Sequence, residues 1–434
     1  MRHYYLIVIL LSLLLTSCGN QQSNKTTSNT TVTFMVFGDP YEQDAFQSVI
    51  DGFYATNPTH NNTPINIDMV ALPSKSDYLT RLTTDFAAGE PPDVFLLNYR
   101  RMAQYHNRGA LDALGPRVTA SDVMDEADYF PVALDAFRDS TGTLVCIPQN
   151  ISSQVVYFNQ DLFDAAGIAY PAHDWTWQEF RQTAIALTKP DEDGDGEPDQ
   201  YGLGLEPHLV RMAPFIWQNG GSLVDDHAAP GRLTLDTPAA QQAMQFVFAL
   251  SQQDNVVPNR TAEAVQSHRQ RFYAGNIAMY VDSRRIVPTM RAVADFNWDV
   301  APLPRGKETA SILHSDGYCL AADSDVKEAA WAFIEFAMSV EGQKPAGRLG
   351  RTVPSLMAVA QSDVFLDPTQ PPANAQVWLD AVPHIRVLPR LENWVRIERT
   401  AAIEFEQAYL GLTTLPDVVD HIQAEARDGL KPLK

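Results

Sequence analysis

Polar side chains follow two apolar runs that are expected to be strands. The run at residues 32–37 is followed by Gly38 and Asp39, and the run at 93–97 is followed by Asn98, Tyr99, Arg100 and Arg101. Because ligands of open α/β sheets bind beyond the carboxyl ends of the strands, we expect these carboxylate, amide, phenol and guanidinium groups to face a ligand.

Motifs of catalysis are missing from the sequence. It contains no GxSxG, HExxH, P-loop or CxxC pattern, and its ten histidines are scattered without metal-ligand spacing. The 53 acidic residues make carboxylate pairs by chance unavoidable, so a secreted glycoside hydrolase stays open as an alternative. We expect no enzyme activity and no cofactor.

An acidic loop at residues 191–199 is similar to a calcium loop. Asp191, Asp193 and Asp195 occupy positions 1, 3 and 5, and Gly196 occupies position 6. Position 12 is Gly202, where such loops carry a bidentate glutamate. We therefore expect a solvated surface loop, with calcium binding as the lesser alternative and no other metal site.

The N-terminus has the features of a leader. Arg2 precedes an apolar run at residues 4–15, and a small residue then precedes Cys18. This pattern resembles a bacterial lipobox, which implies cleavage of the leader 1–17 and lipidation of Cys18. Residues 18–31 are mostly polar, so we expect a flexible tether. The alternative is an ordinary secretory signal in which Cys18 is incidental.

The two remaining cysteines, Cys146 and Cys319, each lie in an apolar, strand-like run. We expect buried thiols that act as small hydrophobic residues, although a disulfide is possible outside the cytoplasm.

Length and charge limit the class of protein. The 434 residues exceed what one hydrophobic core usually holds, so we expect two domains. The net charge of −21 makes nucleic acid and anionic lipid poor partners. No apolar stretch after residue 31 approaches the length of a membrane span. We expect a monomeric body outside the membrane.

Alternating periodicities predict the elements that position these groups. A helical stripe at residues 43–56, a strand at 65–72 and a helix at 78–88 connect the two runs described first. Strand, helix, strand, helix, strand is a doubly wound α/β pattern. A second α/β unit starts near residue 155, and the region 375–430 is expected to be mostly helical.

Local sequence signals predict two helix starts and one buried helix after residue 175. Thr176 and Glu179 form a capping box, and Pro238 follows Thr237 in the first turn of a helix. Residues 329–340 are apolar almost all round, which predicts a helix packed on both sides.

Short motifs in a characteristic order span almost the whole mature chain. Together they resemble the extracellular solute-binding proteins of ABC importers, in the branch of maltose-type and multiple-sugar binding proteins. The motifs lie at residues 93–95, 142–148, 156–163, 166–168, 175–180, 195–202, 217–221, 274–279, 297–304, 328–336 and 350–354.

The resemblance implies the periplasmic-binding-protein fold, in which two doubly wound α/β lobes are joined by hinge strands and hold the ligand between them. It implies an N-lobe at residues 32–150 plus 301–345 and a C-lobe at 151–300 plus 346–434. Pro148, Pro302 and Pro304 mark the expected crossings between the lobes.

The resemblance also implies ligand-binding positions at the strand ends and hinge, on this chain's matching residues. They are Asp39, Asn98, Tyr99, Arg100, Asn150, Ser152, Ser153, Trp217, Asp282, Arg284, Arg285, Asp316 and Arg351.

One stretch departs from the family pattern. Many relatives carry Gly and then a sugar-stacking Trp after the strand that ends near Met279, whereas this chain has Asp282-Ser283-Arg284-Arg285. Arginine prefers a carboxylate or phosphate partner, so an acidic sugar becomes a candidate ligand. For each arginine, a salt bridge to one of the many acids is the alternative.

The resemblance implies a substrate-binding lipoprotein in the bacterial cell envelope, outside the cytoplasm. Such a protein captures a sugar or oligosaccharide between its lobes, and the permease of an ABC transporter reads the closed form. Service to a sensor instead of a permease is an alternative that the sequence leaves open.

Overall fold

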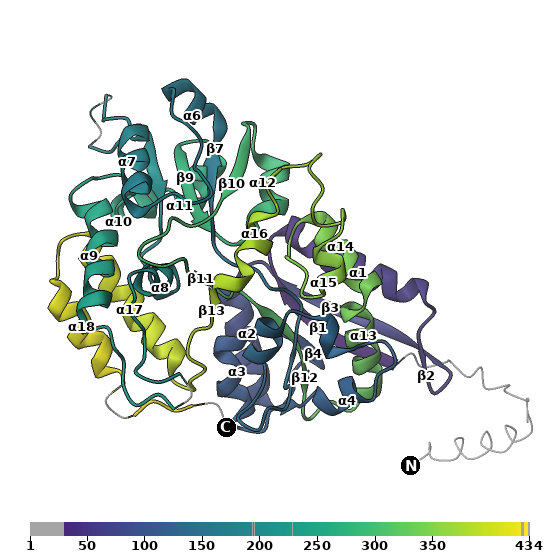
Figure 1. Ribbon diagram of the computed structural model, residues 1–434. Coiled ribbons are helices and arrows are strands. Elements are labelled where there is room, and N and C mark those ends of the chain that lie inside the picture. Colours follow the sequence, from purple (N-terminus) through teal and green to yellow (C-terminus); the bar gives the residue numbers. More distant parts are fainter. Residues whose placement is uncertain (1–29, 193, 195, 228, 427–428, 433–434) are drawn as a thin grey trace, which may run out of the picture.

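Two β-sheets, one in each half of the molecule, organise the chain in the computed structural model (Figure 1). The structure describes residues 30–192, 194, 196–227, 229–426 and 429–432. The predicted leader, the predicted lipidation site Cys18 and most of the predicted tether lie outside the described residues, as do Asp193 and Asp195 of the acidic loop.

The first sheet has the strand order β2-β3-β1-β4-β12-β5, and β6 also pairs with β12. Strands β3, β1 and β4 run parallel, and β12 returns antiparallel to β4. The strands are β1 (Thr30–Phe37), β2 (Thr59–His60), β3 (Thr63–Leu72), β4 (Val94–Asn98), β5 (Leu111–Asp112), β6 (Ile147–Pro148) and β12 (Asp316–Ala321).

The predicted tether is two residues too long. Thr30 and Thr31 already belong to β1, where they pair in register with Ile65 and Asn66 of β3. Polar composition alone did not reveal this because backbone pairing with β3 does not require apolar side chains.

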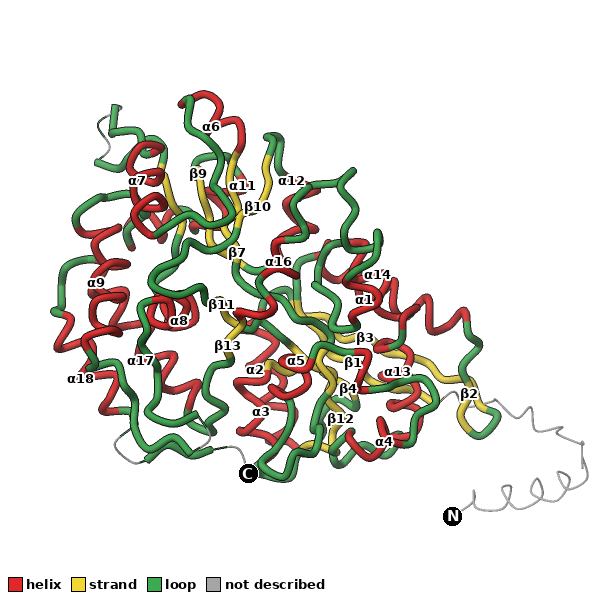
Figure 2. The backbone as a smooth tube through the Cα atoms, viewed as in Figure 1, coloured by secondary structure: helices red, strands yellow, loops and turns green. Residues whose placement is uncertain are grey.

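Helices cover both faces of the first sheet (Figure 2). Asp39 and Glu42 form a capping box at the start of α1, and α2 ends at Gly89, whose φ of 76° suits glycine. The helices of this half are α1 (Pro40–Ala55), α2 (Lys75–Ala88), α3 (Tyr99–His106), α4 (Gly115–Thr119), η1 (Glu126–Asp128), α5 (Pro131–Ala136), α13 (Lys327–Met338), α14 (Val340–Leu349) and α15 (Met357–Ala360).

The second sheet has the order β10-β7-β9-β8. Strand β7 is antiparallel to both β10 and β9, and every residue of β7 and β9 is buried. The strands are β7 (Val155–Asn159), β8 (Tyr201–Gly204), β9 (Ile277–Asp282) and β10 (Trp298–Ala301).

The helices of the second half confirm both predicted starts: Thr176 caps α7 with the Glu179 box, and α9 begins at Pro238. They are α6 (Gln160–Ala166), α7 (Trp177–Leu187), α8 (Leu209–Gln218), α9 (Pro238–Gln252), α10 (Arg260–Val265), α11 (His268–Tyr273), η2 (Arg284–Ile286), α12 (Val287–Val293), α16 (Val377–Asp380), η3 (Val382–His384), α17 (Trp394–Tyr409) and α18 (Leu415–Ala424).

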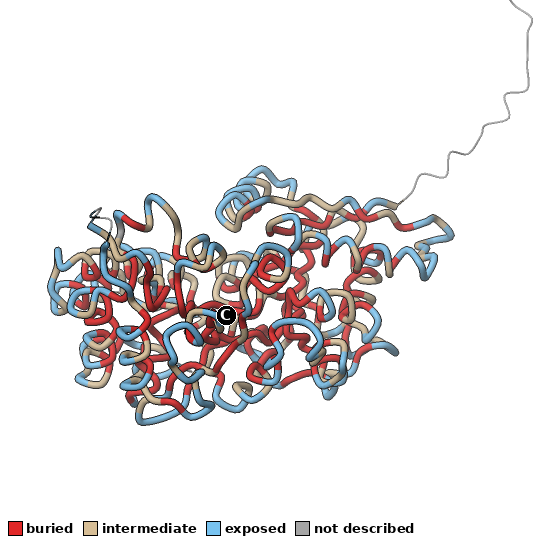
Figure 3. Tube along the Cα trace, turned by 90° about the horizontal axis from the view of Figure 1, so that it is seen from above, coloured by how far each residue is buried: buried red, intermediate tan, exposed pale blue. Residues whose placement is uncertain are grey.

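Three extended segments lie side by side where the chain passes between the sheets. Asn150 pairs with Pro354, and Ser152 pairs with His314. Nearby, β11 (Ser311–Ile312) pairs with β13 (Ile385–Arg386). Buried chain continues from each half into this junction (Figure 3). Our residue boundaries for the two lobes stay a prediction. Helix α14 crosses the predicted boundary between residues 345 and 346, and it packs against α1 of the first half.

Cys146 and Cys319 form a disulfide, so the expectation of two free thiols was wrong. Cys319 lies in β12, and Cys146 directly precedes β6, which pairs with β12. The sequence spacing of 173 residues carried no sign of this pairing.

No helix in the described part of the chain combines the length and apolar character that crossing a bilayer requires.

Candidate ligand-binding site

A cavity of about 160 Å³ lies between the ends of the two sheets. Its lining comes from both halves of the molecule and from the junction. Eight predicted residues line it, namely Asn98, Arg100, Asn150, Ser152, Asp282, Arg285, Asp316 and Arg351. Six further lining residues were not predicted, namely Phe37, Lys75, Arg211, Arg269, Ser283 and His314.

One wall is built at the end of β4. Asn98 caps α3 by accepting hydrogen bonds from the backbone and the Nε of Arg100, at 3.3 and 2.9 Å. Its amide donates to Asp316 Oδ1 at 2.9 Å. Arg100 also forms an ion pair with Glu398 of α17, across the junction. The side chains of this wall are therefore held in place by one another before any ligand arrives.

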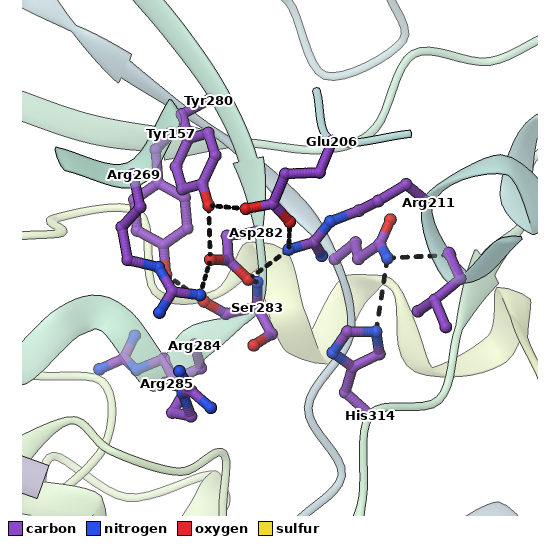
Figure 4. Close-up of polar contacts among 12 residues, drawn as sticks. Tyr157, Glu206, Arg211, Arg269, Tyr280, Asp282, Ser283, Arg284, Arg285 and His314 are labelled. Carbon is purple, nitrogen blue, oxygen red and sulfur yellow. Dashed lines mark hydrogen bonds and ion pairs between the residues drawn. The ribbon is translucent and has the colours of Figure 1, made fainter. Parts of the chain in front are cut away.

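The opposite wall centres on Asp282 at the end of β9 (Figure 4). Its Oδ1 accepts from Arg211 Nη2 at 2.8 Å, and its Oδ2 accepts from Arg269 Nη2 at 3.0 Å. The Tyr280 hydroxyl lies 3.1 Å from Asp282 Oδ2 and 3.0 Å from Glu206 Oε1. Two arginines and two carboxylates thus form one network with balanced charge, in which Arg211 Nη1 and Arg269 Nε have no hydrogen-bond partner among the described residues.

The charges of this network shift its acid–base equilibria. Burial alone would raise the pKa of Asp282, but the neighbouring Arg211, Arg269 and Arg285 outweigh it and hold the pKa well below the usual range. His314 behaves differently, because burial and then the charges of Arg211 and Arg100 lower its pKa well below the usual value. At neutral pH the cavity therefore presents an ionised aspartate and a neutral histidine.

Five predicted residues do not line the cavity. Asp39 caps α1 and accepts a hydrogen bond from the Thr289 hydroxyl of α12. The Tyr99 hydroxyl donates to the carbonyl of Leu313, and Ser153 is fully buried. These side chains support the junction from behind the cavity wall.

Arg284 and Trp217 are the other two. Arg284 is fully buried between the rings of Phe365 and Trp378, at 4.6 and 4.5 Å from their centroids. Trp217 belongs to α8 and is buried in the core, with 1% of its surface exposed. Trp217 lies six positions after Arg211, which places the two side chains about 120° apart around the helix, so only one of them faces the cavity.

Three of the six lining residues that were not predicted come from helices. Lys75 begins α2, Arg211 lies in α8 and Arg269 lies in α11. The predicted positions lie at strand ends and at the hinge, and these helical positions therefore were not among them. Phe37 and Ser283 lie within one or two residues of the predicted positions Asp39 and Asp282. Including the residues on either side of each predicted position would have identified both.

Within the ranges that the structure describes, no group of three His, Cys, Asp or Glu side chains could hold a metal ion. In the acidic loop, Asp191 accepts hydrogen bonds from the backbone of Gly194 and Gly196. Calcium binding there stays a prediction, because two of its three carboxylates lie outside the described residues.

Comparison with known proteins gives a consistent result. Residues 39–344 match the family model of bacterial extracellular solute-binding proteins. A binding protein of Brucella abortus is 22% identical over 375 residues, covering 84% of this chain and 85% of the relative. The erythritol/L-threitol-binding protein of Mycolicibacterium smegmatis is 23% identical over 344 residues, covering 73% of this chain and 68% of the relative.

A solved structure agrees over nearly the full length. An ABC substrate-binding protein of Listeria monocytogenes, in complex with cycloalternan, superposes with a TM-score of 0.83 and 25% identity, covering 92% of this chain and 98% of the other.

Proposed function

The chain belongs to the bacterial extracellular solute-binding proteins, and on this premise we propose that it captures a sugar in the cavity between its two sheets and delivers it to the permease of an ABC importer. The observation that carries the proposal is the shared lining: Asn98 and Asp316 come from the first sheet, and Asp282 comes from the second. A ligand that contacts both walls stabilises the closed arrangement in proportion to its preference for it.

The cavity's chemistry supports a polyhydroxylated ligand. Asn98, Asp282 and Asp316 supply amide and carboxylate groups that can donate to or accept from hydroxyls. The volume of about 160 Å³ is smaller than the ~300–1,000 Å³ of sites for drug-sized molecules, which favours a monosaccharide or small polyol. The name of the erythritol/L-threitol-binding relative is consistent with that size.

A panel of sugars and polyols tests the proposal. Isothermal titration and thermal unfolding are measured for the purified mature chain with each compound. A true ligand at 100 times its dissociation constant is expected to stabilise the protein by about 2.7 kcal/mol. The compound should be recovered chemically unchanged after prolonged incubation, because we propose binding without turnover. Hydrolysis of an oligosaccharide would contradict this and favour the glycosidase alternative.

We also propose that the protein is lipid-anchored at Cys18 outside the cytoplasm and acts as a monomer. The lipobox-like leader supports the anchor, and the family's extracellular placement supports the compartment. Cys18→Ala is expected to release the protein from the membrane fraction of cells without changing its ligand affinity. Sedimentation of the mature chain tests the monomer. Retention of Cys18→Ala at the membrane would contradict the anchor.

A further inference from the structure

Three cationic side chains surround one aromatic ring at one end of the cavity. Lys75 Nζ lies 5.7 Å from the centroid of Phe37, and the guanidinium carbons of Arg285 and Arg351 lie at 5.8 and 6.0 Å. All four side chains line the cavity. We call Lys75, Arg285 and Arg351 the cationic triad.

Carboxylates compensate the triad incompletely. Glu42 Oε1 lies 3.1 Å from Arg285 Nε but 3.9 Å from Arg351 Nε, which is too far for a hydrogen bond. Asp316 acts on Lys75 and Arg351 through its charge and is hydrogen-bonded to Asn98. Lys75 forms no ion pair with any carboxylate in the described part of the chain. Asp282 also interacts with Arg285 through its charge, but Arg211 and Arg269 already share this carboxylate. Glu42 and Asp316 are therefore the two carboxylates left to balance the three positive charges of the triad.

Arg351 has a free hydrogen-bonding edge. It is 4% exposed, and its face stacks on Phe46 with 4.4 Å between the guanidinium carbon and the ring centroid. Its Nε and Nη2 have no hydrogen-bond partner among the described residues. These two nitrogens share one edge of the guanidinium, the geometry that binds both oxygens of a carboxylate or phosphate.

The opposite wall provides the contrast. There Arg211 and Arg269 share Asp282, and Arg211 also pairs with Glu206. A buried guanidinium that lacks hydrogen-bond partners is costly, and an anion that supplies them recovers that cost. The walls differ in charge balance, since Arg211 Nη1 and Arg269 Nε also have no hydrogen-bond partner among the described residues. On the balanced wall such N–H groups suit neutral hydroxyls, whereas the excess positive charge of the cationic triad suits an anion.

We propose that the ligand is a small sugar or polyol that carries an anionic oxygen group, a carboxylate or a phosphate, which binds to Lys75, Arg285 and Arg351. This inference rests on the proposed function. The anionic group lies beside Phe37 and engages the free edge of Arg351, while the hydroxyls reach Asn98, Asp282 and Asp316. The chain's overall charge of −21 disfavours unselective capture of anions, so the selectivity is local to the cavity.

Matched compounds test the charge requirement. Isothermal titration compares D-glucose with D-glucuronate and D-glucose 6-phosphate, and glycerol with D-glycerate and glycerol 3-phosphate. We expect one charged member to bind at least about tenfold more tightly than its neutral counterpart. The gain in affinity comes from hydrogen bonds between ionised groups, which are stronger than those between neutral groups. The carboxylate and phosphate arms show which anion is preferred.

Two variants locate the effect. Arg351→Gln and Lys75→Gln should each remove most of the preference for the charged member, and the half-buried Lys75 serves if Arg351→Gln folds poorly. Arg181→Gln is the matched control, since Arg181 pairs with Asp254 outside the cavity, at 2.6 Å, and should leave both affinities unchanged. Binding of neutral members alone would overturn the charge requirement and leave sugar capture intact. Binding of no member would overturn both proposals.

Discussion

At the scale of single residues, neighbours in sequence take unrelated roles. Arg285 lines the cavity, whereas the adjacent Arg284 is buried between Phe365 and Trp378. Burial lowers the pKa of Arg284 to about 9, and no carboxylate opposes that shift among its causes. Arg284 is therefore a structural residue that packs the junction, and Arg285 is the one positioned to meet a ligand.

The assignment of Trp217 to the core changes the expected effect of removing it. Trp217→Ala should lower the free energy of unfolding by about 3–5 kcal/mol, because the substitution leaves a cavity in a packed interior. Urea denaturation measures the loss. Trp331→Ala is the control, since Trp331 of α13 is only partly buried and should cost less. A fully stable Trp217→Ala with weakened sugar binding would restore Trp217 to the ligand site.

Lys75 makes anion binding depend on pH. Burial lowers its pKa to about 8; the charge of Asp316 opposes this shift, whereas Arg100, Arg101 and Arg285 add to it. Lys75 therefore loses its proton as the pH rises through about 8, and the affinity for a charged ligand should fall between pH 7 and 9. Titration calorimetry across this range measures the effect.

Lys75→Gln should make that affinity nearly independent of pH, and a neutral sugar should show little change in either protein. An unchanged affinity of the original protein for its charged ligand from pH 7 to pH 9 would exclude Lys75 from anion binding.

At the scale of elements, the N-terminus of α1 connects the two halves of the molecule. The capping box of Asp39 and Glu42 fixes the first turn, and the same two side chains meet Thr289 of α12 and Arg285 of η2. Helix α3 makes a second connection through Arg100 and Glu398 of α17. These contacts join the two halves in the structure, so we expect the residues that cap α1 and α3 to influence how readily the lobes close.

Thr289→Val tests this role without changing charge or size. Loss of the hydrogen bond to Asp39 should cost the closed form about 1.4 kcal/mol and weaken ligand binding about tenfold. Small-angle scattering should show a larger radius of gyration for the ligand-free variant. Thr400→Val is the control, because its hydroxyl binds Glu425 between α17 and α18 of the same half. Equal affinities of Thr289→Val and the original protein would refute a closing role for this contact.

At the scale of the whole molecule, the disulfide closes a long loop of the chain. Cys146 and Cys319 lie 173 residues apart, and the segment between them contains every strand of the second sheet. The chain leaves the first sheet just after β6 and returns at β12, and these two strands pair beside the disulfide. The bond therefore ties together two of the crossings between the halves at their base.

Replacing both cysteines with serine should lower the free energy of unfolding by about 2–5 kcal/mol, mainly because the unfolded chain gains freedom. Guanidinium denaturation under oxidising conditions measures the difference. The ligand affinity of the folded variant should be unchanged, since both cysteines lie away from the cavity lining. An identical denaturation midpoint for variant and original protein would show that the disulfide contributes nothing to stability.

Local patterns in the sequence predicted much of the fold. The apolar run at 93–97, the capping box at Thr176 and the stop at Gly89 all correspond to elements in the structure. These features depend on neighbouring residues, so a single sequence contains them. Asn98 was placed at a ligand site for the same reason, because the carboxyl end of a parallel strand can be located from the local sequence. Asp282 was implied by the family resemblance.

Only the tertiary structure decided which residues meet across the chain. The disulfide, the burial of Trp217 and the gathering of Lys75, Arg285 and Arg351 around Phe37 join segments far apart in sequence. Helix faces are oriented by packing against the sheet, so the residue types of α2, α8 and α11 did not show which side chains reach the cavity. The sequence by itself determined the family and predicted a ligand-binding site at the strand ends. Long-range packing decided which charged side chains gather at that site.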